Sequence, residues 1–167
     1  PAVEAHDGVT RSTLVAVQAH RVVGVDARNG TILDPGSSVD LTGSVEGDRI
    51  SWTAPADPAG GTWVVFAAWY RGSAQEPEAG PHTSPKSYVV DHFGDAGVQA
   101  VIDLWNRRIL DFPMRLLLRA AGGNLFEDSL EIETEATIWT PRLPQAFRAG
   151  RGYDLLPFLP FVVEVEE

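Results

Sequence analysis

The chain has 167 residues, of which 44% are hydrophobic, and this is enough for one ordinary domain with a core. Its formal net charge of −10 argues against nucleic acid or an anionic membrane as a partner, because both are themselves negatively charged. The absence of cysteine excludes disulfides and thiolate metal sites. Because the chain begins at Pro1 and ends at Glu167 without a start or closing segment, we expect an internal part of a longer protein.

Residues 13–53 have the pattern of short antiparallel strands. The first of these segments is rich in Val and Ala, and Asn29-Gly30 follows it as a typical hairpin turn, because both residues tolerate positive φ. Shorter β-type segments then alternate with turn residues. We predict an antiparallel, sandwich-like β unit in residues 1–60 with no helix between 13 and 53, and we expect His20 to be a partly exposed strand residue.

The character of the sequence changes after a linker rich in Pro, Gly and Ala at residues 54–61. Residues 62–70 are almost continuously apolar, which is typical of a strand covered on both faces in a parallel layer or barrel. A second short strand is expected at 88–90. The strand and helix order predicts that 61–167 form part of a (β/α)8 barrel, since a complete one needs about 250 residues.

Three helices are predicted in the second half of the chain. In residues 95–109 apolar side chains recur at helical spacing, so Val98, Ile102 and Trp105 are expected in the core. The second helix starts at Asp111, with a proline in its first turn, and ends at Gly122-Gly123. The third is expected to begin with Thr140 as N-cap and to end at Gly150, with Phe147 and Tyr153 fastening it to the sheet.

A burst of acids follows the apolar pair Leu125-Phe126. Apolar strands that end in carboxylates are the form that a barrel active site takes, because catalytic groups sit at the C-terminal ends of its strands. Spacing alone favours a strand that runs into a solvated acidic loop. The acids of this segment are Glu127, Asp128, Glu131, Glu133 and Glu135.

A string of motifs around these acids resembles the α-L-rhamnosidases of glycoside hydrolase family 106. The family pattern D-S-x-E matches residues 128–131, W-T-P matches 139–141, and R-G-Y-D followed by L-P matches 151–160. The upstream pieces Gly61-Thr62-Trp63 and Val90-Asp91-His92 are also similar to members of that family. The resemblance is specific from about Trp63 to Pro160.

The resemblance implies roles for individual residues. Glu131 matches the glutamate that acts as general acid, a role that needs a raised pKa from partial burial. From its place nearer the strand, Asp128 would orient sugar hydroxyls or hold Glu131 through solvent, and an Asx turn at the strand end is the alternative. Independently of the resemblance, Asp91 and His92 follow the expected strand at 88–90, and they would bind substrate hydroxyls at the same rim if the strands are parallel. Trp139 suits either a wall that stacks on the sugar or a place in the core. The family is described as calcium-assisted, but no residue matches a calcium cage or the second carboxylate.

We therefore expect a fragment of a secreted or cell-surface glycoside hydrolase that resembles inverting α-L-rhamnosidases. It would act on a carbohydrate, bind neither nucleic acid nor membrane, and need the remainder of its parent chain to complete the barrel. A non-catalytic carbohydrate-binding protein that reuses the fold is the alternative hypothesis, and a purely structural segment with solvated acids is the third.

Overall fold

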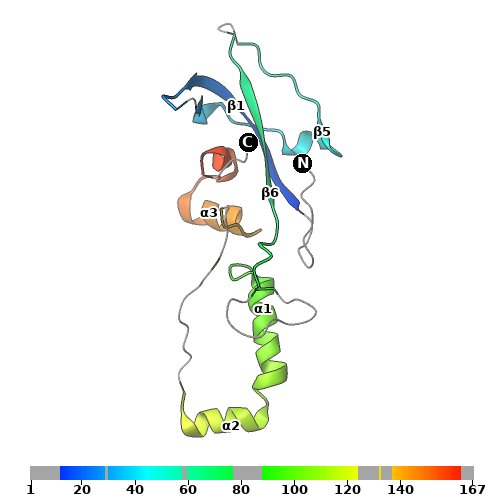
Figure 1. Cartoon of the computed structure of the whole chain (residues 1–167), viewed down its shortest axis with the longest axis vertical. Helices are drawn as coiled ribbons and strands as arrows, with labels where there is room; N and C mark the ends of the chain where they lie inside the picture. The colour runs from blue at the N-terminus through cyan, green and yellow to red at the C-terminus, as the bar shows by residue number, and fades with distance from the viewer. Residues whose placement is uncertain are drawn as a thin grey trace.

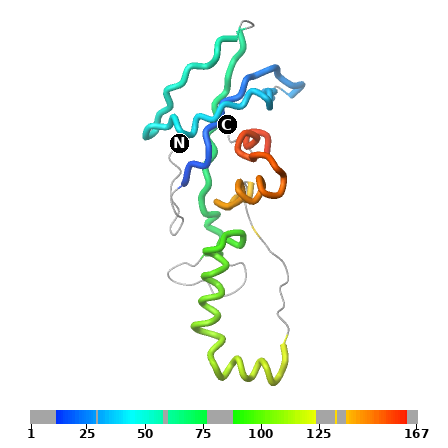
Figure 2. The backbone as a smooth tube through the Cα atoms, turned by 180° about the vertical axis from the view of Figure 1, so that it is seen from behind, coloured from blue at the N-terminus to red at the C-terminus, as the bar shows by residue number. Residues whose placement is uncertain are grey.

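The structure is a computed structural model, and it describes residues 12–28, 30–57, 60–76, 88–123, 132 and 137–162. A β-sheet and a C-terminal helical segment lie at one end of the molecule, and a long helical arm extends away from them (Figure 1). The view from behind shows the C-terminal helical segment beside the sheet, although the residues of the arm separate the two in the sequence (Figure 2).

Strand β1 (Thr13–Val25) is the centre of a four-stranded sheet. Its composition suits a strand, because β-branched residues pack well on a pleated surface. Strand β6 (Trp63–Tyr70) runs antiparallel to it from Thr13 to Arg21, and β3 (Val39–Asp40) pairs with Gln18 and Ala19. Strand β2 (Thr31–Leu33) pairs further along, and β4 (Val45–Glu46) with β5 (Arg49–Ile50) forms a separate two-stranded sheet.

The predicted antiparallel β unit is confirmed. The described residues between 13 and 53 contain strands and two short 3₁₀ turns, η1 (Pro35–Ser37) and η2 (Thr42–Ser44), but no α-helix. The predicted hairpin joins β1 to β2, with Val25 opposite Thr31. Its loop is wider than two residues: the Asp26 side chain accepts hydrogen bonds from the backbone N–H groups of Arg28 (2.7 Å) and Gly30 (2.8 Å).

The prediction that residues 62–70 form a central strand of a parallel layer is wrong. Strand β6 pairs antiparallel with β1, and no parallel pair occurs among the described strands. One face of β6 is open, since Val65 is 46% exposed and Trp69 is 55% exposed. An unbroken apolar run therefore marked a strand whose outward side chains are apolar too, rather than one covered on both faces. The expected strand at 88–90 is also wrong, because no strand is formed there.

Two small apolar clusters cover opposite faces of β1, because successive side chains of a strand point to opposite sides. On one face Ala16 packs with Leu155 and Leu159 from the C-terminal segment. On the other face Val17 and Ala19 pack with Leu41. Trp52 and Trp63 border this second cluster with their rings edge to face at 5.6 Å, so the first of these tryptophans is a core residue.

The helices lie close to where the sequence places them. Helix α1 (Asp95–Leu104) continues through the π-helical turn η3 (Trp105–Ile109), and α2 (Phe112–Ala121) begins at its N-cap Asp111, whose carboxylate accepts from the Met114 N–H at 2.9 Å. Gly122 ends α2 with a φ of 70°. Helix α3 (Leu143–Arg151) and the 3₁₀ helix η4 (Leu156–Phe161) form the C-terminal segment.

Two details of α3 correct the prediction. Its N-cap position is Arg142, without a side-chain cap, so the Thr140 hydroxyl is free for another partner. Its C-terminal glycine is Gly152, with a φ of 80°, rather than Gly150. The fastening role of Phe147 is supported, because it packs against the cluster at Ala16 and meets the Tyr153 ring edge to face at 5.1 Å.

The prediction that the first helix packs into the core is wrong. None of the residues of α1, η3 or α2 is buried. Val98 and Ile102 are each 46% exposed, and Trp105 is 41% exposed. No described helix is long and apolar enough to cross a membrane. The α/β mixture is thus an antiparallel sheet followed by helices, while the division of the chain at residues 60 and 61 stays a prediction, with β6 sharing the sheet of β1.

Candidate functional site

The acids singled out from the sequence fall outside the described residues. Asp128 and Glu131 belong to the stretch 124–131, and Glu127 lies in the same stretch. Their proposed roles stay predictions. The described residues do place the two segments that flank this stretch in the family pattern, namely Asp91-His92 and Trp139-Thr140-Pro141.

Asp91 lies in a turn that leads into α1. Its Oδ1 atom accepts a hydrogen bond from the backbone N–H of Phe93 at 2.9 Å, which is an Asx turn. Its Oδ2 atom accepts a hydrogen bond from the hydroxyl of Thr140 at 3.3 Å. The side chain is exposed, so each carboxylate oxygen keeps a lone pair for a further donor.

Two glycines let the start of α1 approach Asp91 closely. A Cβ added to Gly94 would lie 2.3 Å from Asp91 Oδ2, and one added to Gly97 would lie 2.1 Å from the Asp91 carbonyl oxygen. Neither Gly94 nor Gly97 has a positive φ. Space, rather than backbone freedom, therefore requires glycine at Gly97, where the overlap is with backbone, whereas a side chain at Gly94 would displace the Asp91 carboxylate.

A second contact joins the same two segments. Arg142 forms an ion pair with Asp95, the first residue of α1. The two contacts span 47 and 49 residues of sequence, so they define a junction between residues 91–95 and 140–142. Both charged side chains are largely exposed, at 62% and 81%, and such pairs contribute little stability. The junction therefore positions groups at the surface more than it holds the fold together.

The other two predicted binding residues lie beside this junction. His92 is exposed in the turn next to Asp91. Trp139 is half-buried and packs against the cluster at Ala16, together with Leu143 and Phe147. This packing supports the interpretation of Trp139 as a core residue, and its stacking on a sugar stays a prediction.

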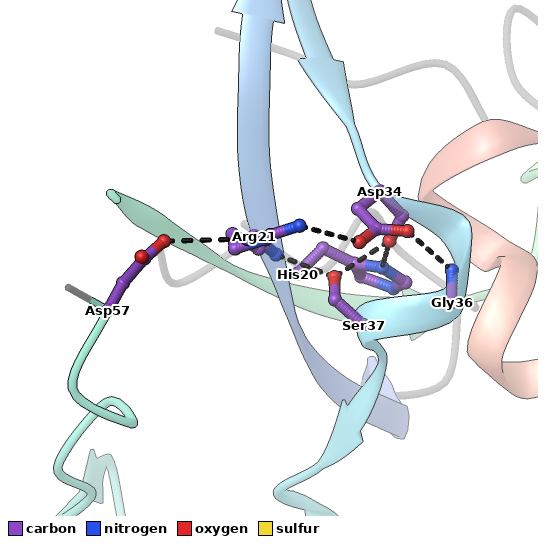
Figure 3. Close-up of polar contacts among 6 residues, drawn as sticks. All are labelled: His20, Arg21, Asp34, Gly36, Ser37 and Asp57. Carbon is purple, nitrogen blue, oxygen red and sulfur yellow. Dashed lines mark hydrogen bonds and ion pairs between the residues drawn. The ribbon is translucent and has the colours of Figure 1, made fainter. Parts of the chain in front are cut away.

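A further polar cluster, which sequence reasoning missed, surrounds β1 near its middle (Figure 3). Arg21 forms ion pairs with Asp34 at 3.2 Å and with Asp57 at 3.5 Å. Ser37 donates its hydroxyl to the Asp34 carbonyl at 2.7 Å and accepts from the Arg21 N–H at 2.8 Å. These contacts fasten the turn at η1 to the strand, so the cluster is structural.

His20 is completely buried beside this cluster, so the expectation of a partly exposed histidine is wrong. Its Nδ1 atom lies 3.3 Å from the Asp34 carbonyl oxygen, which assigns the proton to Nδ1 because a carbonyl only accepts. The ring meets Phe161 edge to face at 5.3 Å, and Nε2 has no hydrogen-bond partner within the described residues. The segment that covers His20 comes from the other end of the chain, which no local pattern reveals.

The comparison with protein families decides the identity of the chain. The model of glycoside hydrolase family 106, described as alpha-L-rhamnosidase, matches residues 7–165. The chain belongs to this family. No protein of curated function and no solved structure matches it. Family 106 membership implies a carbohydrate substrate.

Membership in family 106 covers every residue of the junction and of the acidic stretch, because all of them lie within the matched range. The described geometry contributes an exposed carboxylate, held at both oxygens, that can accept hydrogen bonds from sugar hydroxyls. In the described ranges, no three His, Asp or Glu side chains come together as a metal site. Calcium binding, which the family resemblance implies, therefore stays a prediction without ligands among the described residues.

Proposed function

We propose that this chain carries the general acid and part of the substrate-binding surface of an inverting α-L-rhamnosidase. Glu131 protonates the glycosidic oxygen while a second carboxylate activates a water on the opposite face of the sugar. We assign that second carboxylate to no residue of this chain. Asp128 orients sugar hydroxyls or holds Glu131 through solvent.

In this proposal Asp91 and His92 form hydrogen bonds with the sugar hydroxyls. Trp139, which is half-buried, stacks on the sugar with the part of its ring face that stays exposed. The observation that carries the proposal is the junction, because it joins two separate pieces of the family pattern through Thr140 and Asp91. Thr140 follows Glu131 by nine residues in the sequence, and its hydroxyl contacts Asp91.

Three further parts of the proposal depend on the family resemblance alone. A barrel contribution is proposed only for residues after β6, and parallel strand pairing in a structure of the parent protein would test it. Calcium binding is proposed without ligands from the described residues, and no step passes through the ion. Secretion or display at the cell surface is tested by fractionating the producing cells.

The decisive experiment compares Glu131→Gln with the unaltered protein in the full-length enzyme. Gln keeps the size and hydrogen bonding of Glu but cannot act as an acid, so turnover of a natural α-L-rhamnoside should fall by at least about a hundredfold. The loss should be smaller on an aryl α-L-rhamnoside, because an activated leaving group needs little protonation. Glu133→Gln makes the same chemical change two residues away and should leave turnover near normal.

Each outcome distinguishes the hypotheses. Near-normal turnover by Glu131→Gln on the natural glycoside would show that another acid serves, and Glu127 would be tested next. Binding of L-rhamnose without turnover by the unaltered protein would favour the carbohydrate-binding alternative. In a structure of the active enzyme, a second carboxylate should lie about 6.5–9.5 Å from Glu131, which leaves room for the attacking water.

A further inference from the structure

We propose that Thr140 is a positioning residue: its hydroxyl holds the Asp91 carboxylate in the orientation in which that carboxylate accepts hydrogen bonds from two adjacent hydroxyls of the sugar. The proposal rests on the proposed function, because it takes Asp91 as a group that contacts the substrate. The ligand it implies is the vicinal diol of a pyranoside, which a carboxylate can bind through both of its oxygens.

The first support is that the Thr140 hydroxyl has a specific partner far away in the sequence. The pattern Thr-Pro before a helix predicts an N-cap, but α3 begins later, and Arg142 occupies its N-cap position. The Thr140 backbone takes part in the turn, since its carbonyl accepts from the Leu143 N–H at 3.0 Å. Its hydroxyl instead donates to Asp91 Oδ2 at 3.3 Å.

The second support is that both ends of this contact are fixed. On one side Trp139 and Leu143 both pack against the core cluster, so Thr140 lies between two anchored neighbours. On the other side Gly94 and Gly97 allow the first turn of α1 to pack directly against Asp91, where any larger side chain would overlap it. A hydrogen bond between two fixed segments sets an orientation.

The third support is that each carboxylate oxygen of Asp91 accepts one hydrogen bond and can accept another. Oδ1 accepts from Phe93 N–H and Oδ2 accepts from Thr140, which leaves one lone pair on each oxygen on an exposed side chain. Without Thr140 the carboxylate could rotate about its last bond. A group that is already oriented loses less freedom when it binds a ligand, so Thr140 should raise affinity without contacting the sugar itself.

The contact is too weak to be needed for folding. A hydrogen bond between exposed groups contributes little to stability, and the Arg142–Asp95 pair holds the same segments independently. A positioning role therefore predicts a change in substrate affinity with little change in thermal stability. A purely structural role predicts that any loss of activity follows a loss of stability.

The test uses Thr140→Val and Thr140→Ser in the full-length protein. Val keeps the shape of Thr without the hydroxyl, and Ser keeps the hydroxyl. We expect Thr140→Val to raise KM for a natural rhamnoside and Kd for L-rhamnose about five- to tenfold, with kcat and Tm nearly unchanged. Thr140→Ser should restore both constants to near those of the unaltered protein. In an Asp91→Ala background, Thr140→Val should have no further effect, because its target is gone.

Several results would overturn the proposal. The first is an unchanged Kd for L-rhamnose in Thr140→Val. The second is a loss of affinity in Thr140→Ser that equals the loss in Thr140→Val. The third is a loss of affinity by Thr140→Val in the Asp91→Ala background that is as large as its loss in the unaltered protein. The Kd measurements distinguish this proposal from the proposed enzymatic activity. If the unaltered protein binds L-rhamnose but does not cleave rhamnosides, the proposed activity fails while the Kd series still decides the role of Thr140. If it neither binds nor cleaves, both proposals fail.

Discussion

The sheet region and the helical arm are both rich in apolar residues, yet only the sheet region buries some of them. In the sheet region, defined as β1, β6, α3 and η4, Val17 and Ala19 of the central strand are at most 1% exposed. In the arm, defined as α1, η3 and α2, the exposed fraction reaches 62% at Leu117 and 74% at Phe112. Apolar periodicity thus identifies which residues can be covered, and the partner segment decides whether they are.

The arm is held together by local contacts. Gln99 donates to Asp103 at 2.8 Å, and Arg115 donates to the Leu110 carbonyl at 2.7 Å and to the Asn106 side chain, which fixes the corner between the two helices. Helices of ten residues are marginal in water without tertiary packing. The arm should therefore open at a lower free energy than the sheet region does.

The largest effect is expected from removing a buried leucine of the sheet region. Leu159 is 3% exposed in the cluster with Ala16 and Leu155, so Leu159→Ala should lower the free energy of unfolding by about 2–5 kcal/mol. Leu117→Ala in the arm makes the same chemical change at an exposed helical site and should cost less than about 0.5 kcal/mol. Equal losses in urea unfolding experiments would show that the arm is as well packed as the sheet region.

The next effect tests a partly buried aromatic residue. Phe147 is half-buried against the cluster and meets Tyr153, so Phe147→Ala should cost about 2–3 kcal/mol, below the roughly 3–5 kcal/mol of a fully buried ring. Phe112→Ala is the matched control in the arm and should be nearly neutral, since Ala is also the better helix former. A loss below about 1 kcal/mol for Phe147→Ala would place that ring at the surface.

The sequence predicted the elements better than their partners. The Val-rich strand β1, the hairpin that joins it to β2, and the start of α2 at Asp111 all follow from local residue preferences, and the structure confirms them. The partner of β6 was mispredicted because an unbroken apolar run does not specify strand direction. His20 was mispredicted because the ring that covers it, Phe161, comes from 141 residues later in the chain.

For the candidate site, too, the sequence predicted residues better than the contacts between them. The family pattern picks out Asp91 and the Trp139-Thr140 pair, but neither spacing nor composition predicts that the Thr140 hydroxyl meets Asp91. The ion pairs of Arg21 with Asp34 and Asp57 likewise depend on how η1 and the following loop fold back onto β1. The roles of Asp128 and Glu131 stay predictions that activity measurements must test.

A smaller effect should be confined to the arm. Asp111→Ala removes the N-cap acceptor of α2 and should destabilise that helix by about 1 kcal/mol, whereas Asp111→Asn keeps an acceptor and should lose only part of this. Hydrogen exchange should become faster in α2 and stay unchanged in β1. Faster exchange in β1 as well would mean that the two regions unfold as one unit, contrary to the comparison above.

The smallest effect concerns the link between the two regions. Arg142 beside α3 and Asp95 at the start of α1 form an exposed ion pair, so their coupling free energy from a double-mutant cycle of Arg142→Ala and Asp95→Ala should be below about 1 kcal/mol. The coupling should weaken further as salt rises, because exposed charges are screened. Hydrogen exchange in the first turn of α1 gives the local readout, and β1 serves as the internal control. A coupling that is large and insensitive to salt would show that the charges are shielded from water, and the start of the arm would then belong to the packed region.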